Sequence, residues 1–251
     1  MNLLREYIRE WVRANDKLLM LDKQGIYLEK EDREEISKFL KSMGLLESKT
    51  CGLQPPQTPI KPRTASVLPV DTYRFPNLPY PSVESPEGRK DLDMVIHQYN
   101  NRVVPEELQD AADNDMDGLF ESYLDSRGLT YNTSYYKSLR LDLIPLIKLL
   151  KKHYNRLRPN QTATLLGIEF PGDTLKSAQT PSYPSGHTVQ AFVLALKFSE
   201  QFPDHVDNLL SIAELISQSR IDRGVHFPSD IEFGRLIAYL IVEEMKDGTT
   251  P

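Results

Sequence analysis

The stretch "PSYPSGHTVQAFVLALKFSEQF", Pro181–Phe202, joins a rigid turn to an apolar helix and is the best guide to this fold. From Thr188 onward, its apolar residues recur with helical spacing. Before that point, Pro184 and Gly186 restrict and bend the chain, which places a helix start near Thr188. The backbone N–H groups at a helix start lack intrahelical partners and attract anions.

Two side chains in this turn carry chemistry. Ser185 offers a hydroxyl, and His187 titrates near neutral pH. An ordinary helix cap and one half of an anion-binding site explain these residues about equally well. The rest of the chain has to decide between them.

Apolar stripes of the same kind recur in other parts of the chain. They occupy residues 134–158, 208–220 and 230–245, and a convincing alternating strand pattern is absent. We therefore predict an all-α fold, a helix bundle that begins at about residue 89.

The first part of the chain differs in texture. Residues 1–50 are predicted to be a small helical appendage with a turn at Asp22–Gly25, and they offer a surface for a protein partner. Residues 51–88 are rich in proline and should be extended, as a linker or as a strap. Interleaved aromatics such as Tyr80 favour the strap. Residues 89–251 form the helical domain.

Composition excludes several classes of function. The net charge of −6 argues against binding a nucleic acid polymer or anionic lipid by charge. No apolar run approaches the roughly 18–20 residues that span a bilayer, so membrane insertion is not expected. The charged first residues predict no secretion signal, and the single cysteine, Cys51, allows no internal disulfide. We expect a soluble protein in the cytoplasm.

A second group of residues precedes the opening stretch. Lys151 and Arg158 are seven positions apart, so two helical turns would point both to one side. Pro159 disfavours helix at Arg158 and leaves that side chain free to reach out at the helix end. Taken alone, these cations would be ordinary solvated residues in a last helical turn.

A third group follows the opening stretch. Arg220 ends a predicted helix, and Gly224 lets the chain turn. His226 and Asp230 are four positions apart across the next helix start. The carboxylate can accept the Nδ1–H of His226 and leave Nε2 as an aimed lone pair, although such a pair alone is more often structural.

Together the three groups predict one site. Lys151, Arg158 and Arg220 supply cationic donors for a tetrahedral oxyanion. The Ser185 hydroxyl and the Gly186 N–H add neutral donors. In this arrangement His226 attacks, and His187 protonates the leaving group.

In this order, the motifs Lys-x6-Arg-Pro, Pro-Ser-Gly-His and Ser-Arg-x5-His-x3-Asp resemble the signatures of the type 2 phosphatidic acid phosphatase superfamily. That superfamily includes lipid phosphate phosphatases, class A acid phosphatases and vanadium haloperoxidases. The resemblance covers roughly Leu139–Tyr239 and implies an all-α bundle and hydrolysis without a metal or other cofactor. It implies that His226 becomes phosphohistidine, oriented by Asp230, with His187 as general acid. The residues implied to hold the phosphoryl oxygens are Lys151, Arg158, Ser185, Gly186 and Arg220.

The resemblance leads us to expect a phosphatase of soluble phosphomonoesters. It is strongest to short soluble members from bacteriophages and marine bacteria, which would place the protein in a host cytoplasm or a virion. Three alternatives stay open: a vanadium haloperoxidase, a hydrolase of lipid or isoprenoid phosphates, and a virion-associated binding protein.

One acidic stretch is not assigned to the site. Residues 113–118 resemble the first half of a calcium-binding EF-hand loop, but the twelfth position is Leu124 instead of glutamate. We interpret Asp113, Asp115 and Asp117 as a solvated acidic helix start. Asp222 and Arg223 are interpreted as a surface ion pair.

Overall fold

The computed structural model describes residues 21–22, 25–26 and 78–247. Within 78–247 the regular structure is helical, which confirms the all-α prediction for this part of the chain. Its helices are α3 (Pro86–Asn100), α4 (Glu106–Asn114), α5 (Met116–Ser126), α6 (Thr133–Tyr154), α7 (Pro159–Leu165), α8 (Gly186–Gln201), α9 (Val206–Asp222) and α10 (Pro228–Asp247), with short 3-10 turns η2 (Lys176–Ala178) and η3 (Pro203–His205).

The N-terminal segment contains a small correction to the helical prediction. Strand β1, Leu21–Asp22, pairs antiparallel with β2, Gly25–Ile26, with Leu21 opposite Ile26. The described residues at this predicted turn therefore pair as short strands, which corrects the helical prediction for Leu21 and Ile26. The helices predicted for the remainder of residues 1–50 lie outside the described residues.

The chain divides into two compact units, Met1–Gln54 and Pro55–Pro251. The predicted boundaries after residues 50 and 88 stay predictions. Most of the predicted strap, up to residue 77, lies outside the described residues. At its end, Leu78 is buried, and its carbonyl accepts a hydrogen bond from the Tyr183 hydroxyl at 3.1 Å.

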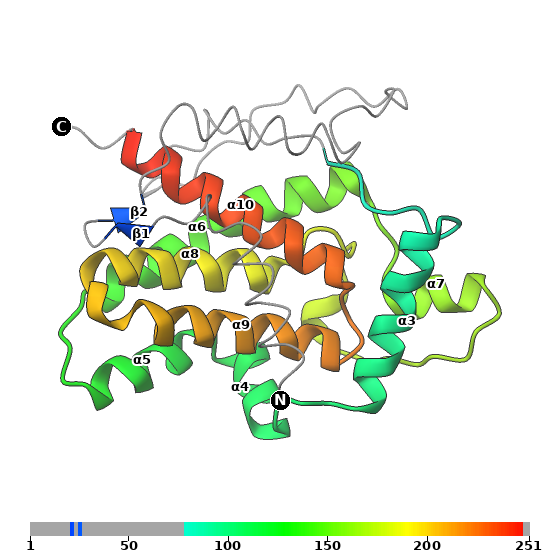
Figure 1. Ribbon diagram of the computed structural model, residues 1–251, viewed down its shortest axis with the longest axis horizontal. Coiled ribbons are helices and arrows are strands. Elements are labelled where there is room, and N and C mark those ends of the chain that lie inside the picture. The colour runs from blue at the N-terminus through cyan, green and yellow to red at the C-terminus, as the bar shows by residue number, and fades with distance from the viewer. Residues whose placement is uncertain (1–20, 23–24, 27–77, 248–251) are drawn as a thin grey trace. The chain divides into compact units, whose positions relative to one another are not determined.

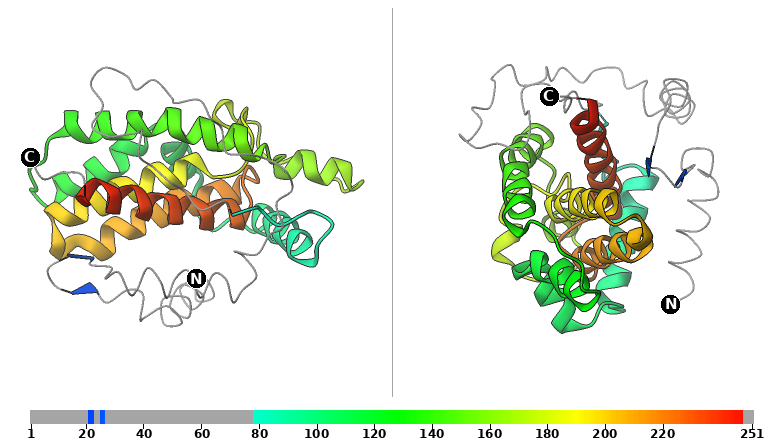
Figure 2. Two further views of the ribbon diagram at one scale, coloured as in Figure 1. Left: turned by 90° about the horizontal axis from the view of Figure 1, so that it is seen from above. Right: turned by 90° about the vertical axis from the view of Figure 1, so that its left-hand side faces the viewer.

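Helix α8 is the central element of the second unit. It packs against α6, α9 and α10, as the end-on view in Figure 2 shows. Its buried apolar side chains run from Val189 to Phe198. Burial of each large apolar side chain contributes about 1.5–3 kcal/mol, so this helix anchors the bundle.

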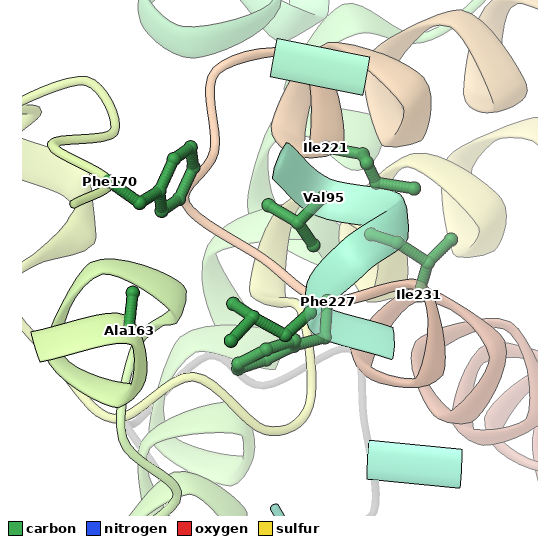
Figure 3. Close-up of a cluster of buried hydrophobic side chains, with 7 residues drawn as sticks. Val95, Ala163, Phe170, Ile221, Phe227 and Ile231 are labelled. Carbon is green, nitrogen blue, oxygen red and sulfur yellow. The ribbon is translucent and has the colours of Figure 1, made fainter. Parts of the chain in front are cut away.

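A second apolar cluster joins α3 and α7 to the start of α10 (Figure 3). Its buried members are Leu92, Val95, Ala163, Phe170, Ile221, Phe227 and Ile231. Phe227, which is 1% exposed, follows His226 directly in the chain. The cluster therefore fixes the backbone that carries this histidine.

The antiparallel order of α8, α9 and α10 gathers the predicted site at one end of the bundle. The start of α8, the end of α9 and the start of α10 all lie at the right-hand end in Figure 1, beside the junction of α6 and α7.

None of the helices in the described part of the chain has both the length and the apolarity to cross a membrane.

Candidate active site

His226 and Asp230 form the predicted pair, and both side chains are buried. The chain turns after α9 at Gly224, whose φ of +66° is one that glycine adopts without strain. His226 Nδ1 lies 2.9 Å from Asp230 Oδ2. That oxygen also accepts hydrogen bonds from the Ser182 hydroxyl at 2.5 Å and the Phe227 N–H at 2.9 Å. The carboxylate thus assigns the ring proton to Nδ1 and leaves the lone pair on Nε2.

Electrostatics keep this pair in the form that a nucleophile needs. Burial and the nearby Arg158 guanidinium lower the pKa of His226 well below its usual value, so the ring is neutral. Burial alone would raise the pKa of Asp230, but the Arg156 guanidinium and the hydrogen bond from His226 hold it below its usual range.

Arg158 and Lys151 reach this pair, but not as two positions on one helix. Helix α6 ends at Tyr154, and Asn155 takes a left-handed φ of 48°. Arg158 then lies in extended backbone before Pro159, at the start of α7. The prediction of two successive helical turns is therefore wrong, although a tight turn brings both side chains to the same place.

The Arg158 guanidinium faces the free nitrogen of the nucleophile. Its NH1 lies 3.0 Å from His226 Nε2 and donates to the Val225 carbonyl at 2.6 Å. Lys151 Nζ donates to the carbonyls of Pro181 and Ser182 at 2.6 and 3.1 Å. Burial lowers the pKa of Arg158 to about 10, and burial with the charge of Arg158 also lowers the pKa of Lys151.

The start of α8 carries the neutral donors. Ser185 is the N-cap residue, and its oxygen accepts from the Thr188 hydroxyl at 2.9 Å. The helix begins at Gly186, two residues before the predicted start. A Cβ on Gly186 would lie 3.1 Å from Ile147 Cγ2, so glycine allows α8 to approach α6 closely.

His187 lies on the first turn of α8, with its Nε2 3.6 Å from Asp113 Oδ1. Burial and the Arg220 guanidinium lower the pKa of His187 to about 3, against an opposing effect of Asp113. In this state both site histidines are therefore neutral.

Asp113 is a site residue that sequence reasoning missed. The interpretation as a solvated helix start is wrong for this residue, because its side chain is 9% exposed and is bonded to the site. Arg220 NH1 donates to Asp113 Oδ1 at 2.7 Å, and the Ser177 hydroxyl donates to the same oxygen at 2.5 Å. Arg220 Nε is buried without a hydrogen-bond partner among the described residues. The Asp113 carboxylate therefore binds Arg220, which is one of the cations predicted to hold an oxyanion.

Arg156 was also missed, because it lies among the variable positions between Lys151 and Arg158. Its NH1 donates to Asp230 Oδ1 at 2.7 Å, and its NH2 donates to Asp91 Oδ2 at 2.8 Å. No short-range pattern identifies either Asp91 or Asp113, since each meets its arginine only through tertiary contact.

The other acidic residues of this region do not converge. Asp115 caps α5, and Asp117 pairs with Arg140 at 2.6 Å. Within the described residues, no group of three or more potential ligands is placed to hold a metal ion. Asp222 and Arg223 are not an ion pair with each other, since Asp222 is buried and accepts from the N–H groups of residues 103 and 104, while Arg223 pairs with Asp110 and Asp173.

All of the predicted site residues therefore lie at one end of the bundle. Electrostatic interactions link Lys151 with Arg158 and Arg220, and link His187 with Arg220 and Lys151. The result is a neutral, oriented imidazole beside three cationic side chains and a helix start. This arrangement can bind a tetrahedral anion and present a nitrogen lone pair to it.

Comparison with known proteins gives one family match over the part of the chain that carries most of this site, and several similar proteins. Residues 138–245 match the sequence model of the PAP2 superfamily. An acid phosphatase of Zymomonas mobilis is 35% identical over 92 residues, which cover 35% of this chain and 33% of that protein. Non-specific acid phosphatases of Providencia stuartii and Salmonella typhimurium are 34% and 36% identical, each over 35% of this chain. The match spans about a third of the length of these curated relatives.

Among solved structures, the chain is similar to a transmembrane PAP2-type phosphatidylglycerolphosphate phosphatase from Bacillus subtilis. The TM-score is 0.45 at 19% identity, over 66% of this chain and 90% of that one.

Proposed function

We propose that this protein is a phosphatase of the PAP2 superfamily, which residues 138–245 match, and that it hydrolyses soluble phosphomonoesters through a phosphohistidine at His226. The observation that carries the proposal is the state of His226. Its Nδ1 is committed to Asp230, and its Nε2 faces Arg158 at 3.0 Å. The acid phosphatase activity of the named relatives favours this reaction over halide oxidation.

Substrate binding replaces the internal partners of the cations. The phosphoryl oxygens take hydrogen bonds from Arg158, Lys151 and Arg220, and from the donors at Ser185 and Gly186. The NH1 of Arg158 then no longer contacts His226 Nε2, and Asp113 no longer pairs with Arg220. Charge-assisted donors of this kind stabilise the equatorial oxygens of the transferring phosphoryl group.

In the first displacement, His226 Nε2 forms a bond to phosphorus while the ester P–O bond breaks. The leaving oxygen takes a proton from His187. In the second displacement, water attacks phosphorus, His187 takes a proton from that water, and the Nε2–P bond breaks. Inorganic phosphate leaves with the proton that His187 took from the water, so both histidines are again neutral as in the free protein.

His187 needs a proton that it does not hold in the free protein. Burial and then the charge of Arg220 lower its pKa, and a bound phosphate offsets the charge of Arg220. The substrate thus raises the pKa of its own general acid, and a monoanionic ester can bring the proton with it. This dependence favours turnover on the acidic side of neutral pH.

The experiment that tests the proposal is a phosphate-release screen over soluble and lipid phosphates, with and without EDTA. We expect release from soluble monoesters that survives EDTA and is lost in His226→Ala. Release from lipid phosphates alone would overturn the substrate class, and release by folded His226→Ala would overturn the mechanism. The cytoplasmic location, the bacteriophage or marine origin and a protein partner for residues 1–50 stay predictions.

A further inference from the structure

We propose that Arg156 is a positioning residue for the nucleophile, which holds the Asp230 carboxylate in the orientation that receives the Nδ1–H of His226. The inference rests on the proposed function and adds a residue that acts through Asp230 on the nucleophile. It also extends the site to α3, which lies outside residues 138–245.

The guanidinium of Arg156 is bound on two sides and over one face. NH1 donates to Asp230 Oδ1 and to the Ser229 hydroxyl, both at 2.7 Å. Its central carbon lies 3.8 Å from the centroid of the Phe227 ring. Arg156 is 5% exposed, so these contacts hold a charge that is nearly removed from water. A buried charge with this set of contacts has little freedom to move.

Asp91 of α3 fixes the other end of the guanidinium. Its Oδ2 accepts from Arg156 NH2 at 2.8 Å and contacts the Ser229 hydroxyl. Its Oδ1 accepts from the Ser229 N–H at 3.1 Å, in the first turn of α10. Asp91 therefore ties both the arginine and the helix that carries Asp230 to one point.

This division of contacts explains the geometry of Asp230. Its Oδ2 is shared by His226 and two other donors, whereas Oδ1 is bonded to Arg156. A carboxylate held at both oxygens cannot rotate away from the imidazole. Without Arg156, the buried Oδ1 would lose its ionic partner and the carboxylate would be free to turn.

Arg156 also sets the charge that His226 experiences. The groups around that ring are Asp230, which favours the imidazolium, and Arg158 and Lys151, which oppose it. The positive charge of Arg156 compensates Asp230. Removal of Arg156 leaves the carboxylate charge uncompensated, so the pKa of His226 should rise.

The test compares four variants of the full chain, each checked for folding by circular dichroism. Arg156→Gln should lower kcat by about 10- to 100-fold, as removal of a partner behind a reacting group usually does. Arg156→Lys keeps the positive charge but loses the planar guanidinium that bonds two carboxylates at once, so its kcat should lie between those of Arg156→Gln and the wild type. The matched control is Arg235→Gln, since Arg235 pairs with Glu214 elsewhere on α10 and α9. The control should keep wild-type kcat.

Two readouts separate positioning from general damage. The inhibition constant of inorganic phosphate should stay within about threefold of wild type, because Arg156 is not among the proposed phosphate donors. The acid limb of kcat/KM should move to higher pH in Arg156→Gln, since that limb reports deprotonation of the nucleophile. Asp91→Asn should not move the limb upward, because it removes a negative charge and leaves Arg156 in place.

A measurement that needs no turnover keeps the two proposals apart. Nitrogen NMR of histidine-labelled protein, with His226 assigned by its loss in His226→Gln, should show a higher His226 pKa in Arg156→Gln than in wild type. A wild-type protein without phosphatase activity refutes the proposed function, while this NMR shift still supports the role of Arg156. A folded Arg156→Gln with wild-type kcat and an unmoved His226 pKa overturns the inference. If Arg156→Gln does not fold, a wild-type kcat in Arg156→Lys overturns the inference.

Discussion

Replacement of Asp113 by asparagine tests whether this carboxylate competes with the substrate for Arg220. The pair is short, at 2.7 Å, and its side chains are 1% and 9% exposed for arginine and aspartate. Two opposite charges about 4 Å apart attract by about 4 kcal/mol at an effective dielectric constant of 20, and a charge-assisted hydrogen bond contributes about 1.5–3 kcal/mol net.

We use the net value because, once the pair separates, Asp113 exchanges Arg220 for other partners and Arg220 is bonded to the phosphate. Phosphate that no longer displaces a carboxylate from Arg220 should therefore bind about 10- to 150-fold more tightly to Asp113→Asn. In the absence of phosphate, the same variant leaves Arg220 buried without its counter-charge. That loss should lower the free energy of unfolding by about 3 kcal/mol, the lower end for a broken buried pair.

The assay is calorimetric titration with inorganic phosphate, combined with urea unfolding at several phosphate concentrations. Ligand that binds only the folded state stabilises it by mass action, so phosphate should restore most of the lost stability. The matched control is Asp110→Asn on the same helix, whose carboxylate pairs with Arg223 at 2.7 Å but is 58% exposed. Its effect should stay below about 1 kcal/mol.

The reasoning also predicts a split in turnover. Asp113 raises the pKa of His187, so Asp113→Asn should slow esters with poor leaving groups more than activated esters. A folded Asp113→Asn that binds phosphate no more tightly than wild type would refute the competition.

Four other outcomes are expected. His187→Ala should slow release from poor leaving groups by about 100- to 10,000-fold and from activated esters much less, and equal losses across a leaving-group series would contradict the acid role. His187 should contribute up to about 1.4 kcal/mol per pH unit to a fall in the free energy of unfolding below about pH 6.5, because the unfolded chain protonates His187 there while the folded chain keeps it neutral to about pH 3. His226, whose pKa is also lowered, adds to the same fall. Denaturation between pH 7 and 5 measures this, and a smaller slope in His187→Gln would confirm its source. Vanadate should inhibit the wild type competitively, since vanadate mimics the transferring phosphoryl group, and should inhibit Arg220→Ala less strongly. Strong bromide oxidation by the vanadate-loaded protein would favour a haloperoxidase instead. A chain that begins at Cys51 should keep its activity, and inactivity with an intact fold would show that residues 1–50 complete the site.

The sequence by itself determined the parts of this protein that depend on local pattern. Apolar stripes of helical period placed α6, α8, α9 and α10, and motif spacing identified the residues that meet at one end of the bundle. The His226 and Asp230 pair belongs to this class, because a separation of four positions across a helix start brings the two side chains together.

Only the tertiary structure decided which charged side chains pair with these residues. Arg156 meets Asp91 and Asp230 across 65 and 74 positions, and Arg220 meets Asp113 across 107. Such pairs leave no periodic signal, because each depends on how whole helices pack. The turn at Asn155 was also decided by the tertiary structure. The motif spacing identified the right residues, but α6 ends at Tyr154, four residues before Arg158. The left-handed backbone of Asn155 ends the helix and changes the direction of the chain.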